Sequence, residues 1–325
     1  MRQKRVKDGW FPIGKVFSGP GSPEQGLQES SPQAVYHFTR VDQVDQLVRA
    51  SEDDPDTGFM ARLMTLCSLP RTNPGNRLQY VRRNGPYTLG MTAGINNRLP
   101  YGNIPRLLLA WVCTEAVKTR NRELVLGRSL SKFMRDLGMQ TSGGSTRGDR
   151  TRLRNQMNRL FGCTVSLIYE EASGFSRVSS LVADKHEFWW NPTRPEECTL
   201  WDSKIRLGEA FFHEIIRHPV PLDMNILKAL KRSSLGLDLY LWLTYRTFSL
   251  RHPMQLVWRR LYRQFGADPA KADDNVTVQA FRKECLRELQ KIKTAWPSLN
   301  YSTAKGVLVL SPSKPSIAPT NRRLV

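Results

Sequence analysis

The residues best suited to recognition chemistry lie in a basic segment that runs from Arg147 to Phe161. Its apolar residues recur at helical spacing and predict one buried face: Leu153, Met157, Leu160 and Phe161. The side chains away from that face are the candidate DNA-binding residues Arg147, Arg150, Thr151, Arg154, Asn155 and Asn158. Arginine pairs with guanine and asparagine with adenine in the major groove, so this face is suited to reading bases.

The alternative for this segment is an ordinary solvated basic face. The segment holds five arginines and one aspartate, Asp149, a net charge of +4. Because acids are nearly absent, pairing between residues one helical turn apart does not explain the arginines. The composition therefore favours contact with DNA.

A second candidate surface lies on the predicted helix from Val276 to Trp296. The side chains away from its apolar face are Gln279, Arg282, Lys283, Gln290 and Lys293. Leu286 interrupts this face, and Glu284 and Glu288 make ordinary surface pairing a stronger alternative here. Basic residues on the preceding helix and near two hairpin tips are further candidates, for phosphate contact: Arg259, Arg260, Arg263, Arg177 and Lys305.

The sequence contains incomplete versions of two enzyme motifs. The segment Gly9–Val16 has the spacing of a phosphate-binding loop, but Val16 replaces the hydroxyl residue that ligates Mg²⁺. His213 and His218 are five residues apart, one too many for a zinc-binding helix. The five histidines include no His-x-His pair. We therefore expect no catalytic residue, metal site or cofactor, and a protein that is not an enzyme.

The overall charge points to a polyanionic partner. The chain has 325 residues, 49 of them Lys or Arg against 29 Asp or Glu, for a net charge of +20. Nucleic acid is the first candidate and an anionic membrane surface the second. No apolar run approaches the roughly 20 residues that span a bilayer. The basic N-terminus has no apolar region behind it, so we do not expect it to be a signal peptide. Five widely spaced cysteines indicate reduced thiols in a cytoplasmic protein.

The segment 227–246 is the most apolar part of the chain, and its pattern is ambiguous. Leu235, Leu237, Leu239, Leu241 and Leu243 alternate as in a strand. Read as a helix, the apolar residues cover most of the circumference, as in a fully buried helix. The run is long for a strand, since strands usually have about 5–6 residues. We predict a buried helix.

The same order of elements appears twice. Each time, the predicted order is an apolar helix, a short helix that ends at glycine, a long basic helix and a hairpin. The first set lies at 104–117, 129–138, 147–161 and 163–183, and the second at 227–246, 256–265, 276–296 and 301–310. A helix is also predicted over 58–69 and a hairpin over 78–91, with Asn84–Gly85 at its turn.

This order predicts an α+β protein with two tandem winged-helix domains, in which the last helix of each enters the major groove. The expected domains are 58–202 and 203–312. A flexible N-terminal tail and linker, 1–57, precedes them, and a disordered tail, 313–325, follows.

From about Gly58 to Pro312, the chain resembles the plasmid-encoded RepA-type replication initiators. The resemblance rests on long segments: 68–77, 104–117, 218–221 and the central apolar segment 227–246. It supports the helical reading of that central segment. It identifies no individual base contact, so the candidate residues above rest on helix geometry.

The resemblance implies a theta-type plasmid initiator in the bacterial cytoplasm. Such proteins bind repeated iterons in double-stranded origin DNA, help to open the origin, and bring in the host initiator and replicative helicase. Related initiators act as monomers and repress their own gene as homodimers. The alternatives are a plasmid copy-control repressor without initiation activity and a nicking initiator, whose tyrosine nucleophile and metal ligands the sequence does not supply.

Overall fold

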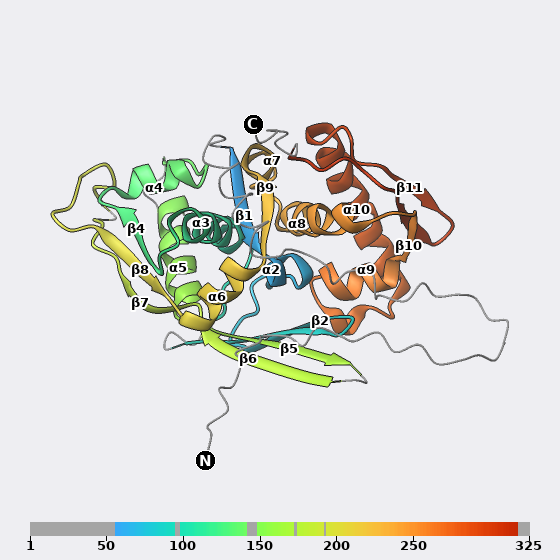
Figure 1. Ribbon diagram of the computed structural model, residues 1–325, viewed down its shortest axis with the longest axis horizontal. Helices are drawn as coiled ribbons and strands as arrows, with labels where there is room; N and C mark the ends of the chain where they lie inside the picture. The colour runs from blue at the N-terminus through green and yellow to red at the C-terminus, as the bar shows by residue number, and fades with distance from the viewer. Residues whose placement is uncertain (1–55, 95–97, 142–147, 172–173, 192, 318–325) are drawn as a thin grey trace, which may run out of the picture.

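Two long apolar helices, α3 (Ile104–Thr119) and α8 (Ser234–Ser249), occupy the middle of the molecule (Figure 1). The computed structural model describes residues 56–94, 98–141, 148–171, 174–191 and 193–317. The predicted flexible tail up to residue 55 and the Gly9–Val16 motif lie outside these ranges. Between the two helices runs an antiparallel ribbon of β1 (Thr57–Ala61) and β9 (Pro219–Asp223).

Each central helix begins a series of elements in the same order. The first series continues with β4 (Glu123–Gly127), α4 (Leu130–Asp136), α5 (Asp149–Phe161), β5 (Thr164–Glu171) and β6 (Gly174–Leu181). The second series continues with β10 (Met254–Val257), α9 (Trp258–Phe265), α10 (Asn275–Ala295), β11 (Tyr301–Ala304) and β12 (Val307–Leu310). Both series lie in one mixed helix-and-strand fold with open antiparallel sheets.

The sheets around the two series differ. In the second, β10 pairs directly with β12, and the order is β10-β12-β11. In the first, β4 pairs instead with β8 (Ser203–Leu207), which pairs with β7 (Ala183–Glu187). The hairpin β5–β6 extends a further sheet that includes β2 (Gln79–Asn84) and β3 (Tyr87–Thr92), in the order β2-β3-β5-β6.

The remaining helices are short. They are α2 (Arg62–Leu66), α6 (Glu209–Arg217), α7 (Met224–Ala229) and the 3-10 turn η2 (Pro269–Lys271). None of the described helices is long and apolar enough to span a membrane. The buried apolar side chains of all these elements form one continuous cluster.

The central apolar segment is helical, as predicted, but a turn at residues 230–233 divides it into α7 and α8. Ser233 caps α8 by accepting a hydrogen bond from the Gly236 amide at 3.0 Å. The side chains of Leu235, Leu239 and Trp242 are fully or almost fully buried. The alternating pattern therefore reflects a helix that is surrounded by protein on nearly all sides.

One local prediction was wrong, and one strand was not predicted. The helix expected over residues 58–69 covers only α2, because residues 57–61 form β1 and pair with β9 about 160 residues later. Strand β10 was missed for the same reason, since β12 stabilises it from far along the chain. The β2–β3 hairpin was predicted correctly, although its two-residue loop is Gly85–Pro86, with Gly85 at φ 58°.

The tail predicted to be disordered begins at residue 313, and the structure describes it as far as 317. Ser316 lies within hydrogen-bond distance of the Tyr240 hydroxyl, 3.3 Å away, and the Lys314 carbonyl accepts from the Trp296 indole at 3.0 Å. Residues 318–325 lie outside the described ranges.

Candidate nucleic-acid interface

Helix α5 presents a polar face to solvent, opposite its core face. Leu153, Met157, Leu160 and Phe161 are buried, as the spacing predicted. Thr151, Arg154 and Asn155 are exposed, whereas Asn158 is half-buried. Asp149 in the first turn favours the start of the helix, because a negative charge there complements the helix dipole. Arg147 lies outside the described residues.

Two further side chains of α5 have roles within the protein. Arg150 is half-buried and donates from Nε to the Thr141 carbonyl at 3.2 Å. Gln156, which the sequence did not single out, is buried and accepts a hydrogen bond from the Tyr101 amide at 2.9 Å. Arg154, by contrast, makes no hydrogen bond or ion pair with any residue in the described ranges.

Helix α10 starts from a strong cap and exposes part of its predicted face. The Asp274 carboxylate accepts from the amides of Val276 and Thr277 at 3.1 and 3.3 Å. Gln279 and Lys283 are exposed. Both lie in the first half of the helix, which is the part that meets base edges in helix-turn-helix proteins.

Three other predicted residues of α10 have partners within the protein. The Arg282 guanidinium lies 5.8 Å from the centre of the Trp258 ring. Lys293 donates to the Pro297 carbonyl at 2.7 Å, and the Gln290 side chain accepts from the Tyr301 hydroxyl at 3.4 Å. These contacts favour a structural role for the three residues.

Three further exposed residues of α10 were not among the predicted site residues. Val276, at the start of the helix, is 78% exposed, and Arg287 and Lys291 are exposed further along it. The spacing could have indicated Arg287 and Lys291, because together with Lys283 they recur every four residues and so share one side of the helix. Arg287 and Lys291 both pair with buried Glu288, at 3.5 and 2.9 Å.

The residues predicted to contact phosphate are all exposed, but they differ in their hydrogen-bond and ion-pair partners within the protein. On α9, Arg259 donates to the Asn275 side chain at 2.8 Å, and Arg263 pairs with Asp273 at 3.2 Å. Arg260 has no such partner among the described residues. Arg177 is exposed on β6, and Lys305 is exposed beside Gly306 at the β11–β12 turn.

Residues 99–257 match the family model for plasmid-encoded RepA protein. Over this segment the chain is similar to the plasmid-encoded RepA family. The segment contains the whole first series, with α5, and extends through α8 to β10. The match confirms the family resemblance seen in the sequence, and this similarity supports a role as a replication initiator.

Solved structures with a similar fold come from RctB. A crystal structure of selenomethionine derivatives of RctB domains 2 and 3 aligns with a TM-score of 0.50 at 14% identity, over 78% of this chain and 97% of that chain. A second structure of domains 2–3 aligns with a TM-score of 0.46 at 14% identity, over 76% and 94%. No curated protein sequence is a significant match. At this identity, the likeness to RctB concerns the fold alone.

The histidines considered for zinc lie in different surroundings in the RepA segment. His213 is half-exposed on α6 and lies 3.9 Å from Glu209. His218 directly follows that helix, and its buried Nδ1 has no hydrogen-bond partner among the described residues. No group of three histidine, cysteine, aspartate or glutamate side chains within the described ranges is placed to hold a metal ion.

Glu214 lies between these histidines on α6. It is a buried acid whose negative charge is only weakly compensated by nearby positive charges. Its side chain is 3% exposed, and neither carboxylate oxygen has a hydrogen-bond partner in the described part of the chain. Arg62 is 4.0 Å away. Burial raises the pKa of Glu214 to about 7, although Arg62 and Arg217 act in the opposite direction. Burial, Arg62 and Arg217 together lower the pKa of His218 to about 4.

We expect Glu214→Gln to stabilise the protein at alkaline pH. The folded state keeps the Glu214 proton up to about pH 7, whereas the unfolded chain releases it near its ordinary pKa of 4.5. Wild-type stability is therefore lost as the pH rises between these values, by up to about 3 kcal/mol. Urea unfolding at pH 4.5 and 8 should show equal stabilities at the lower pH and a more stable variant at the higher one. Equal stabilities at both would contradict a protonated, buried Glu214.

Proposed function

We propose that this protein is a non-enzymatic plasmid replication initiator that binds repeated sequences in double-stranded origin DNA. The observation that carries this proposal is the exposed polar face of α5, within the RepA segment. Arg154 and Asn155 have the side-chain chemistry that reads guanine and adenine, and the buried Leu153 and Met157 fix the direction in which they point. The net charge of +20 adds sequence-independent attraction to the DNA backbone.

In this proposal each series is a winged helix, with α5 and α10 as recognition helices and β5–β6 and β11–β12 as wings. The order β10-β12-β11 supports this for the second series, because a winged helix pairs its first strand with the last strand of the wing. The first series departs from that arrangement, since β8 lies between β4 and β7. The proposed first domain, 58–202, therefore takes β8 from the start of the second, 203–312.

The family resemblance extends the proposal to origin opening, in the bacterial cytoplasm, and to recruitment of the host initiator and replicative helicase. A homodimer that represses its own gene and limits copy number belongs to the same proposal. A copy-control repressor without initiation activity is the alternative.

A footprint on the DNA that flanks the gene, made at several salt concentrations, tests this proposal. Protection of regularly spaced direct repeats that weakens as salt rises is the expected result. Protection of a single inverted repeat at the promoter would support the repressor instead. Supercoiled origin DNA incubated with protein and Mg²⁺ should remain intact, and nicked circles would show that the protein is an enzyme.

Arg154→Ala should relax the base preference at one position of the repeat and cost about 1–3 kcal/mol of binding free energy. The matched control is Arg194→Ala, which removes an exposed arginine outside both series whose nearest acid is Glu197, 3.9 Å away. Binding to a panel of single-base variants of the repeat measures both quantities. If the Arg154 and Arg194 variants behave alike, α5 does not read bases through this residue.

A further inference from the structure

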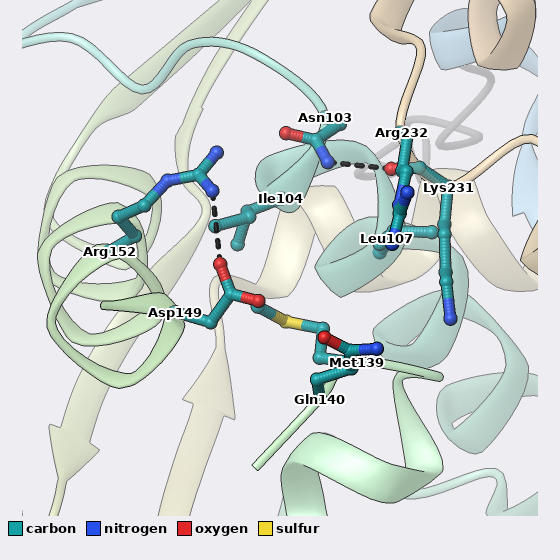
Figure 2. A pocket seen from close by; sticks show the side chains of 9 residues that line it. All are labelled: Asn103, Ile104, Leu107, Met139, Gln140, Asp149, Arg152, Lys231 and Arg232. Atoms are coloured by element: carbon teal, nitrogen blue, oxygen red, sulfur yellow. Dashed lines mark hydrogen bonds and ion pairs between the residues drawn. The ribbon is translucent and has the colours of Figure 1, made fainter. Parts of the chain in front are cut away.

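A pocket of about 240 Å³ lies where the two series meet (Figure 2). Its walls come from four places: the start of α3, the start of α5, the turn that joins α7 to α8, and the residues Met139 and Gln140 that follow α4. Figure 2 shows Arg152 projecting from α5 on one side, with Lys231 and Arg232 on the other. The first residues of α3, Asn103 and Ile104, lie between them. The pocket thus brings together charges from the two halves of the chain.

The polar lining of this pocket is predominantly positive. Arg152, Lys231 and Arg232 contribute three positive charges, and Asp149 contributes one negative charge. Asp149 accepts a hydrogen bond from Arg152 at 3.0 Å, which fixes the position of the guanidinium. Arg232 is exposed and forms no hydrogen bond or ion pair with any residue that the structure describes. The lining therefore has excess positive charge and a guanidinium that is free to bind an anion.

The turn that carries Arg232 is fixed to α3 through Asn103. Asn103 directly precedes α3, but its side chain forms no capping hydrogen bond with that helix. Its Nδ2 instead donates to the Lys231 carbonyl at 2.6 Å. The first turn of α3 contains no acidic residue, so the positive end of its dipole adds to the field of the three cations.

We propose that this pocket binds a phosphate group, supplied by the DNA backbone when α5 lies on the origin. The source in DNA rests on the function proposed above. The volume lies below the roughly 300–1,000 Å³ of common small-molecule sites, which suits a phosphate with its water better than a larger ligand. Arginine is well matched to phosphate oxygens, because its guanidinium can donate two parallel hydrogen bonds.

The consequence is a contact that depends on both halves of the protein at once. Arg152 belongs to the first series, whereas Arg232 lies in the turn that precedes α8, the helix that begins the second. A phosphate held between them would fix the second series relative to α5 on the DNA. The pocket would thereby set the register of the two halves without reading any base.

Arg232→Ala tests this inference, with Arg194→Ala as its control. The variant should bind the origin repeat about 10-fold more weakly at moderate salt, and the slope of log affinity against log salt should fall by about 1. Base preference should stay unchanged, in contrast to the Arg154 variant. Because Arg232 is exposed and unpaired, its thermal unfolding should match that of the wild type. Wild-type affinity and slope in this variant would overturn a DNA phosphate in the pocket.

Neutral methylphosphonate linkages, placed one at a time along the repeat, locate the phosphate. One position should weaken wild-type binding and have no effect on the Arg232 variant. If every position weakens both proteins equally, no backbone phosphate occupies the pocket.

Inorganic pyrophosphate, titrated by calorimetry without DNA, distinguishes a free phosphate source. Binding that is lost in Arg232→Ala and tightened in Asp149→Asn, because the acid is removed, would assign the pocket to a free phosphate compound if no methylphosphonate position has a selective effect. The absence of both this binding and the methylphosphonate effect would overturn the phosphate site. A wild-type protein that ignores the repeats but binds pyrophosphate through Arg232 would instead contradict only the proposed function.

Discussion

Asp238→Ala should destabilise the whole protein by about 3–5 kcal/mol. Asp238 on α8 accepts two hydrogen bonds from Arg106 on α3, at 2.6 and 2.7 Å. The two side chains are only 3% and 2% exposed, respectively. Removing the carboxylate leaves the guanidinium buried with its charge uncompensated. A loss of this size is a large fraction of the free energy of unfolding of a typical protein, which is about 5–15 kcal/mol. Urea unfolding of the wild type and the variant measures the difference.

Two further variants serve as controls for Asp238→Ala. Glu196→Ala breaks the exposed pair of Arg135 and Glu196, 3.5 Å apart, and should change stability by less than about 1 kcal/mol. Arg106→Met combined with Asp238→Leu removes both buried charges and should be more stable than Asp238→Ala alone. It should not reach the wild type, because Arg106 also donates to the carbonyls of Leu69 and Pro70. A loss below 1 kcal/mol in Asp238→Ala would show that Arg106 finds other compensation.

The position of this pair explains why the effect should be global. Arg106 and Asp238 lie on the first helices of the two series, which occupy the middle of the fold (Figure 1). The pair is therefore one of the contacts through which the two halves stabilise each other. We expect the two series to unfold together in a single transition, and a second transition in the variant would locate the loss at this junction.

The sequence predicted the elements that local signals specify. Helices α3, α5 and α10 follow from apolar spacing, and the β11–β12 hairpin follows from Lys305–Gly306, where Gly306 has a φ of 78°. Each signal lies within the element itself, so no distant partner was needed. Strands β1 and β10 could not be predicted in this way, because each is completed by a strand far along the chain.

The candidate site shows the same division. Arg154 is exposed as predicted, because the buried face of α5 determines the opposite one. Arg282 also lies on the predicted side of α10, but a tertiary neighbour, the Trp258 ring, contacts it. Lys293 donates instead to the Pro297 carbonyl, just beyond the end of the same helix. The pocket between Arg152 and Arg232 joins positions 80 residues apart, so no periodicity within one helix could indicate it.

Arg82→Leu should destabilise the protein by about 3–5 kcal/mol and disturb the second series more than the first. Arg82 is fully buried on β2 and donates to the carbonyls of Arg263 and Gly266, both at 2.9 Å, and to the Tyr80 hydroxyl at 2.6 Å. It thus places a positive charge at the C-terminal end of α9, where helix carbonyls lack partners. Each charge-assisted bond is worth about 1.5–3 kcal/mol, and leucine leaves both carbonyls buried without a donor.

Arg83→Leu is the matched control, because the next residue on the same strand is exposed on the opposite face of the sheet. Hydrogen exchange should show faster opening at the end of α9 in the Arg82 variant and no change in the Arg83 variant. Since α9 carries Arg259, Arg260 and Arg263, the Arg82 variant should also lose the part of the footprint that belongs to the second series. Equal stabilities of the two variants would show that α9 does not depend on this arginine. A full-length footprint from a destabilised Arg82 variant would show instead that the second series contributes little to DNA binding.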